Sequence, residues 1–173
     1  MLSCRESNFC LAQTPVCCKY LGKEFGLYPD KEEEVWYADV LNTTIHDFFG
    51  EGRLVFHGRG FTESYYTQKE ETQPYIDWFK KERFAKWMGT LERCLAANNG
   101  GHGFAIGDKL TYVDLALLQV LRGVESSFPD TYSEQINNFP LLKAHRSRIE
   151  SRPNLQAYFK SGRSRPMEGN SMM

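Results

Sequence analysis

The strongest constraint on the fold is a helix start at Thr111, within the segment GDKLTYVDL that occupies positions 107–115. The Thr111 hydroxyl can accept from the backbone amide three residues on, and the Asp114 carboxylate can reach back to the amide of Thr111. Leu110 and Leu115 can also pack on each other as a hydrophobic staple. These features predict a sharply defined helix N-terminus. They assign Thr111 and Asp114 to structural capping and give them no catalytic role.

The helix that follows is apolar on nearly every face. Gln119 and Arg122 are its main polar interruptions. The apolar positions recur at helical offsets and include Val113, Leu115, Ala116, Leu117, Leu118, Val120, Leu121 and Val124. A helix that is apolar nearly all round is buried in a core, so this segment is predicted to be the central helix of a bundle.

The residue pattern in the rest of the chain predicts a succession of helices. Glycine, proline and apolar spacing predict a helix that opens at Thr14-Pro15 and closes at Gly22 or Gly26. Further helices are predicted over about 31–49 and 72–97, with Pro74 in the first turn of the last one. The segment 50–52 is expected to interrupt the second helix. Only the region near Leu11 has the character of a strand. The predicted fold class is therefore all-α.

Length and charge limit the functions available to the chain. Its 173 residues, 41% of them hydrophobic, can bury one substantial core. A net charge of -1 gives no overall electrostatic case for nucleic acid or an anionic membrane. No apolar run is long enough to span a bilayer, and the first residues lack the apolar core of a secretory signal. We therefore expect a cytoplasmic protein with no nucleic-acid or membrane partner.

The cysteines and histidines suggest neither a disulfide framework nor a metal site. The five cysteines are odd in number, and the adjacent Cys17 and Cys18 cannot easily bond to each other. Cys4 and Cys10 lie near the same end of the chain, and no C-x-x-C step is present. The four histidines are scattered. We expect reduced cysteines and no bound metal.

The helix start at 107–114 resembles the signature of the helical C-terminal domain of cytosolic glutathione transferases, in which Gly-x-x-apolar-Ser/Thr-x-x-Asp opens the central helix. The segments NFPLL at 138–142 and SRPNLQAYF at 151–159 resemble that domain's last two helices. LAQTP at 11–15 resembles the Gln-Ser/Thr turn near the end of the family's N-terminal, thioredoxin-like domain. The resemblance runs from about Leu11 to Arg165.

This resemblance implies a division of the chain. Residues 1–28 would be a remnant of the glutathione-binding, thioredoxin-like domain, comprising its last strand and helix. Residues 29–165 would form the helical C-terminal domain, a glutathione-transferase-like bundle, and residues 166–173 a flexible tail.

The resemblance also implies glutathione-binding residues. Gln13 and Thr14 occupy the family's turn, where a helix N-terminus directs free amides at the γ-glutamyl carboxylate of glutathione. Thr14 could instead serve only as a cap for the helix opened by Pro15. Asp47 matches an acidic residue that reaches across a homodimer to the γ-glutamyl amine of the partner's glutathione. An exposed acidic residue on a helix can equally be a solvated surface residue.

Three aromatic residues are candidates for the pocket that receives an apolar electrophile in this family. They are Phe56 and His57, near the end of the second helix, and Tyr112. Aromatic residues at such places are also ordinary core residues, so this assignment rests on the resemblance alone.

The resemblance implies a transferase that joins the glutathione thiol to electrophilic, apolar substrates in detoxification and glutathione metabolism, with glutathione as co-substrate. In the family, a Tyr, Ser or Cys of the N-terminal domain activates the thiol, and no residue here matches it. The sequence begins ten residues before Leu11. We therefore expect either part of a longer protein or a natural short form. The alternative function is a non-catalytic helical module that binds another protein or an apolar ligand.

Overall fold

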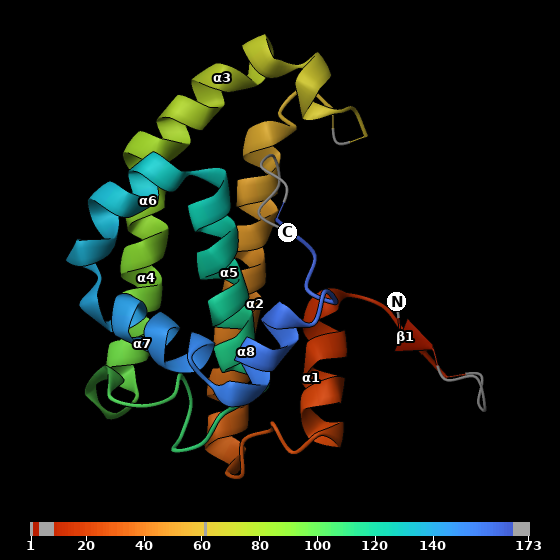
Figure 1. The fold of residues 1–173 in the computed structure, drawn as a ribbon, viewed down its shortest axis with the longest axis vertical. Coiled ribbons are helices and arrows are strands. Elements are labelled where there is room, and N and C mark those ends of the chain that lie inside the picture. Colours follow the sequence, from red (N-terminus) through yellow and green to blue (C-terminus); the bar gives the residue numbers. More distant parts are fainter. Residues whose placement is uncertain (1, 4–8, 61, 168–173) are drawn as a thin grey trace.

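The structure is a computed structural model that describes residues 2–3, 9–60 and 62–167 (Figure 1). The first half contains β1 (Leu2–Ser3), β2 (Cys10–Leu11), α1 (Thr14–Glu24), α2 (Glu32–Phe56), the 3₁₀ turn η1 (Tyr65–Thr67), α3 (Lys69–Trp78), the π-helical segment η2 (Phe79–Arg83) and α4 (Phe84–Ala97). The second half contains the 3₁₀ turn η3 (Asn99–Gly101), α5 (Tyr112–Ser127), α6 (Pro129–Gln135), the 3₁₀ turn η4 (Ile136–Asn138), α7 (Pro140–Glu150) and α8 (Pro153–Lys160).

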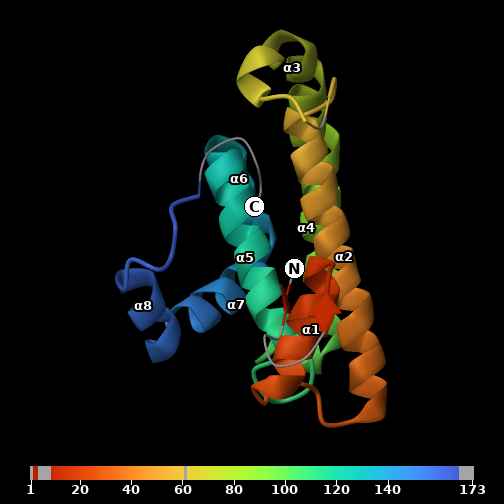
Figure 2. The same cartoon turned by 90° about the vertical axis from the view of Figure 1, so that its right-hand side faces the viewer.

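The chain is an all-α bundle, as the sequence predicts, and it begins with two short antiparallel strands, of which only the one at Leu11 is predicted. β1 pairs with β2, Leu2 opposite Leu11. In Figures 1 and 2 the long helices α2, α4 and α5 run side by side, α1 lies against one side of α2 and α5, and α8 lies on the outer side of α5. This arrangement places the N-terminus of α1 next to the central helix.

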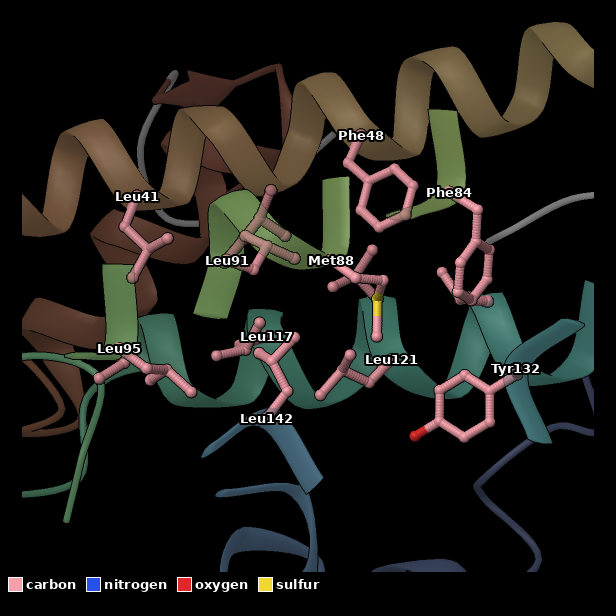
Figure 3. Packing of buried hydrophobic residues seen from close by; sticks show 14 of the residues in the cluster. Leu41, Phe48, Phe84, Met88, Leu91, Leu95, Leu117, Leu121, Tyr132 and Leu142 are labelled. Carbon is pink, nitrogen blue, oxygen red and sulfur yellow. The ribbon is translucent and has the colours of Figure 1, made fainter. Parts of the chain in front are cut away.

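The core lies between α2, α4 and α5. Figure 3 shows Phe48 from α2, Met88 from α4 and Leu121 from α5 pointing toward one another, and none of the three is exposed. Phe48 also stacks on Trp87, with ring centroids 5.0 Å apart. Full burial of such side chains is the main source of stability in a bundle of this size.

The predicted start of α5 is confirmed. The backbone amide and the hydroxyl of Thr111 donate to Oδ2 of Asp114 at 2.8 and 3.0 Å. Oδ1 of Asp114 accepts from the amide of Ala105 at 2.7 Å and contacts Nε2 of the buried His145 at 2.9 Å. Asp114 is fully buried, so these partners replace the water that its carboxylate loses on folding.

The predicted end of the second helix is wrong. α2 continues through Gly50-Glu51-Gly52 to Phe56. Glycine in a helix costs about 1 kcal/mol relative to alanine, but here tertiary contacts outweigh that cost. Gly52 is buried, and the Glu51 carboxylate accepts from Arg83 and from the indole of Trp87.

The predicted helix over 72–97 is present in a modified form. It begins earlier, at Lys69, and a π-helical segment separates α3 from α4. Pro74 therefore lies inside α3, not in its first turn. The early start follows from the buried Gln68, whose carbonyl accepts from the Thr72 hydroxyl at 2.9 Å. The side-chain amide of Gln68 also bonds the loop backbone at Gly60.

The Glu51–Arg83 ion pair predicts a pH-dependent stability. Nε and Nη2 of Arg83 each donate to Glu51 at 2.7 Å, and these bonds hold the pKa of Glu51 below its ordinary value of 4.5. A lowered pKa contributes stability that is present above pH 4.5 and lost as the pH falls through the folded-state pKa. We expect Glu51→Gln to lower the free energy of unfolding at pH 7 by about 1–2 kcal/mol in urea titrations.

That difference between Glu51→Gln and the wild type should shrink progressively below pH 4.5. Glu82→Gln is the matched control, because Glu82 is 41% exposed and its nearest amines lie 3.9 and 4.0 Å away. Its effect should stay below about 0.5 kcal/mol at every pH. A Glu51→Gln deficit that does not change with pH would contradict the role assigned to the ion pair.

Candidate functional site

The first candidate site is the turn that leads into α1. Gln13 is exposed and precedes the helix with φ 69° and ψ 117°. The φ value alone fits the small left-handed region that non-glycine residues occasionally use, but ψ is far too large for it, so the φ/ψ pair lies outside that region. Such strain costs on the order of 1–3 kcal/mol and is concentrated at binding and catalytic sites. The strained backbone of Gln13 therefore lowers the stability of the fold, and strain of this kind indicates a candidate functional site.

The same turn leaves the N-terminus of α1 without a side-chain cap. Thr14 is the first helical residue, so Gln13 takes the N-cap position and makes no side-chain cap bond. The first intrahelical bond is donated by the amide of Cys17 to the carbonyl of Gln13 at 3.0 Å. Pro15 has no amide, so the amides of Thr14 and Val16 remain for another acceptor. Uncapped amides and the positive end of the helix dipole suit an anion.

A cavity of about 520 Å³ opens beside this turn, between α1, α2 and α5. Thr14 lies at its edge and Tyr112 in its wall, so the structure brings together two of the residues singled out in the sequence. The remaining lining is mostly apolar and comprises Cys18, Leu21, Gly22, Phe25, Leu27, His46, Phe49, Leu115, Ala116 and Gln119. An apolar cavity next to uncapped backbone amides is suited to an amphipathic molecule.

Tyr112 is buried in the wall of this cavity and is held there by a polar contact. Its hydroxyl donates to Asp39 at 3.4 Å, and Asp39 also pairs with Lys19 at 2.6 Å. Burial, with a smaller contribution from Asp39, raises the pKa of Tyr112 well above its ordinary value of 10. Its hydroxyl therefore stays protonated at neutral pH and is unsuited to act as a base. Asp39 of α2 thus links α1 to α5 through its contacts with Lys19 and Tyr112.

The other candidate residues lie elsewhere. Asp47 is exposed on α2, adjacent to His46 of the cavity lining. Phe56 is buried in the core, where it stacks on Phe128 with ring centroids 5.4 Å apart. His57 follows α2, with Nδ1 3.0 Å from the carbonyl oxygen of Glu63. Phe56 and His57 thus do not line the cavity beside α1.

Sequence reasoning did not identify Cys18 and His46 as lining residues. Both face the cavity because α1 and α2 cross there, which is a tertiary effect with no local motif. Burial raises the pKa of the Cys18 thiol, so it is mostly protonated and a weak nucleophile. Nδ1 of His46 lies 2.7 Å from the carbonyl oxygen of Asn42, which fixes the ring at the cavity wall.

Within the described residues, no group of three or more His, Cys, Asp or Glu side chains is placed to hold a metal ion. Among the helices that the structure describes, none is both long and apolar enough to cross a bilayer.

The bundle and the turn at Gln13 define the class of protein, a helical C-terminal domain preceded by the end of a second domain. Residues 56–162 match the family model "Glutathione S-transferase, C-terminal domain". The chain belongs to the glutathione transferase family.

Individual relatives agree with this assignment. A "Glutathione S-transferase" of Plasmodium yoelii yoelii is 31% identical over 148 residues, which cover 86% of this chain and 61% of the relative. "Glutathione S-transferase P 1" of Bufo bufo is 30% identical over 168 residues, 96% of this chain and 72% of the relative. The chain thus spans somewhat under two thirds of the Plasmodium relative's length.

A solved structure shares the fold. The "Pi-class Glutathione S-transferase" of Onchocerca volvulus superposes with a TM-score of 0.72 at 24% identity, covering 92% of this chain and 70% of that one. At this identity, the match supports the overall fold alone.

The contact between α1 and α5 yields a stability prediction. A Cβ on Gly22 would lie 2.7 Å from Cδ1 and 3.0 Å from Cβ of Tyr112, closer than side chains tolerate. We expect Gly22→Ala to lower the free energy of unfolding by about 1–2 kcal/mol, because overpacking outweighs the better helix propensity of alanine. Thermal and urea unfolding would measure this change.

Gly50→Ala is the control, because Gly50 lies within α2 and a Cβ there meets nothing within 4 Å. This substitution should raise the free energy of unfolding by about 0.5–1 kcal/mol. If Gly22→Ala also stabilised the chain, the close packing of α1 on α5 described above would be wrong.

Proposed function

We propose that the turn at Gln13 binds the γ-glutamyl carboxylate of glutathione in a transferase that conjugates the glutathione thiol to electrophilic, apolar substrates. The observation that carries the proposal is the strained, uncapped start of α1 beside an apolar cavity. The amides of Thr14 and Val16 would donate to the carboxylate, and the Gln13 side chain would lie alongside it. Membership of the family supports this choice of anion.

The reaction is attack of the glutathione thiolate on an electrophilic carbon, which forms a carbon–sulfur bond. In a substitution the leaving group departs with the electron pair of the broken bond, and in an addition the substrate takes up a proton. This chain's contribution is placement: the turn fixes one end of glutathione, and the cavity takes the apolar part of the electrophile. Tyr112 shapes that cavity as proposed from the sequence. None of the described residues fits the role of thiol activator. This chain would therefore bind and orient glutathione and the electrophile.

The proposal includes a homodimer in a cytoplasmic, detoxifying enzyme. α2 presents Trp36, Tyr37 and Val40 with exposed fractions of 66%, 67% and 64%. Trp36 and Val40 are one helical turn apart, so they share a face, and large exposed apolar residues favour burial against another surface. Asp47 is exposed farther along α2, where a second copy could present it to the γ-glutamyl amine of glutathione bound by its partner.

A non-catalytic helical module that holds apolar ligands is the second candidate. The observation in its favour is the cavity itself, which is largely apolar and would bind an apolar molecule without any thiol. This candidate predicts binding that does not depend on the residues of the turn. The glutathione proposal predicts that binding does depend on the residues of the turn.

Calorimetric titration of glutathione into the 173-residue chain tests the main proposal. We expect saturable binding, weakened about tenfold by Gln13→Ala or by Asp47→Ala, since each removes a polar partner of the γ-glutamyl group. S-hexylglutathione should bind more tightly than glutathione, because its alkyl chain buries apolar surface in the cavity.

Thr43→Ala is the matched control, since Thr43 is exposed on α2 one turn before Asp47. It should leave the affinity unchanged. Absence of glutathione binding, or equal affinities in wild type and in both site variants, would contradict the proposed site. An affinity for S-hexylglutathione that Gln13→Ala leaves unchanged would support the second candidate.

Sedimentation equilibrium tests the dimer. We expect Val40→Asp to raise the dimer dissociation constant at least tenfold, roughly the cost of placing a charge in an apolar contact. Tyr66→Ser is the control, because Tyr66 is 68% exposed but lies in η1, beyond the far end of α2. A wild-type chain that stays monomeric at every concentration would disprove the interface on α2.

A further inference from the structure

The cavity beside α1 is largely apolar, and few of the described side chains that line it can form hydrogen bonds. Those side chains are Thr14, Cys18, His46, Tyr112 and Gln119. The Tyr112 hydroxyl already donates to Asp39, and the sulfur of Cys18 is a weak acceptor. Thr14 is at the edge of the cavity, and Gln119 is exposed on α5. His46 therefore supplies the strongest free acceptor within the apolar wall.

A contact with the backbone of α2 selects one tautomer of His46. Nδ1 of the ring lies 2.7 Å from the carbonyl oxygen of Asn42, one turn earlier in the helix. A carbonyl oxygen can only accept, so Nδ1 carries the hydrogen and donates it. In the neutral ring Nε2 then keeps its lone pair and is an acceptor.

Asn42 is a rigid support for this contact. Its side chain is buried, at 3% exposure, and Nδ2 donates to the carbonyl oxygen of Pro15 at 3.1 Å. This bond joins α2 to the first turn of α1, so the Asn42 backbone is fixed relative to both helices. The His46 ring also contacts Phe49, with ring centroids 5.8 Å apart. The two neighbours hold the ring in one orientation.

The free nitrogen of His46 is on the edge of the ring that faces away from α2. Nδ1 is directed at the helix backbone, whereas Nε2 is at the distal edge of the imidazole. Among the residues that the structure describes, none bonds to Nε2, and this atom is not enclosed by protein. Because His46 lines the cavity, a molecule bound there can reach the nitrogen.

We propose that Nε2 of His46 is a specificity-determining acceptor, which selects apolar molecules that carry a neutral hydroxyl or N–H donor. The proposal rests on the proposed function, which assigns this cavity to the apolar part of the substrate. A ligand hydroxyl that enters an apolar cavity loses its water and needs a new acceptor. A ligand without a donor leaves Nε2 unpaired. A site built around such a hydrogen bond discriminates against the ligand that lacks it.

Titration of two matched probes into the 173-residue chain tests the proposal in the absence of glutathione. 4-Pentylphenol carries a hydroxyl donor, and in 4-pentylanisole a methyl group replaces the hydroxyl hydrogen. We expect the phenol to bind about tenfold more tightly, although the anisole is the more apolar molecule, because only the phenol donates to Nε2. Equal affinities, or tighter binding of the anisole, would overturn the proposal.

Variants of His46 locate the acceptor. His46→Phe keeps a flat ring without nitrogen, so it should abolish the preference for the phenol and change the affinity for the anisole by less than about twofold. His46→Gln keeps an acceptor in its amide oxygen and should retain part of the preference. His102→Phe is the matched control, because His102 is exposed after η3 and does not line the cavity. A full preference for the phenol in His46→Phe would contradict the assignment.

Nitrogen NMR of the histidine rings gives a readout on the unmodified chain, so the test stands even if His46→Phe does not fold. Protonated and unprotonated ring nitrogens give distinct signals, and neutral His46 should show a protonated Nδ1 and an unprotonated Nε2. The phenol should shift the Nε2 signal much more than the anisole does. Equal shifts, or an unprotonated Nδ1, would disprove the role of His46.

Glutathione titrated into the same variants separates this proposal from the proposed function. Loss of the preference for the phenol with intact glutathione binding would refute the role of His46 alone. A chain that prefers the phenol but does not bind glutathione would refute the glutathione site and leave the acceptor in place.

Discussion

The structure depends on one buried carboxylate. Asp114 has no exposed surface, and its two oxygens are bonded to the start of α5, to the preceding loop at Ala105 and to His145 of α7. Three segments of the chain are thereby fixed at one point in the core. Removing such a carboxylate would leave several buried donors unpaired, which costs about 1–3 kcal/mol each. The capping box is thus both a helix signal and the junction that sets where α5 begins.

The candidate site follows from that junction through the next residue in the chain. The amide of Tyr112 donates to the carbonyl of Leu27 at 2.9 Å, and its ring stacks on Tyr28, so the end of α1 is held against the start of α5. Gly22 allows the close approach of α1 to the same ring. Because α1 is rigid over its 11 residues, fixing its C-terminal end also fixes the turn at Gln13. Local capping at Thr111 therefore influences the geometry of the turn at Gln13, about a hundred positions earlier in the sequence.

The sequence was sufficient to predict those structural features that neighbouring residues determine. The cap at Thr111 and the apolar pattern of α5 predicted the central helix, and the turn at 11–15 predicted the start of α1. The continuation of α2 through two glycines was missed because it depends on Glu51 meeting Arg83 and Trp87, partners 32 and 36 positions away. The division at 1–28, 29–165 and 166–173 stays a prediction, as do the ligand roles of Gln13, Thr14 and Asp47. Cavity linings such as Cys18 and His46 arise only where helices cross, and no spacing rule identifies them.

Helix α5 borders two cavities of different character, the one beside α1 and a second of about 450 Å³ between α5, α8 and the segment that follows α8. Both touch Leu115 and Gln119 on the exposed edge of α5, yet the first is closed by the apolar face of α1 and the second by the basic α8 and the segment after it. The difference lies in the covering elements, since the wall contributed by α5 is shared. Positive charge is available at both, as backbone amides at the start of α1 and as arginine side chains near α8. Backbone amides at a helix start present their donors in one fixed direction, whereas a guanidinium group presents its donors in a planar fork at the end of a side chain. Under the proposed function, selectivity for the γ-glutamyl carboxylate would depend on the fixed backbone amides of the strained turn at Gln13.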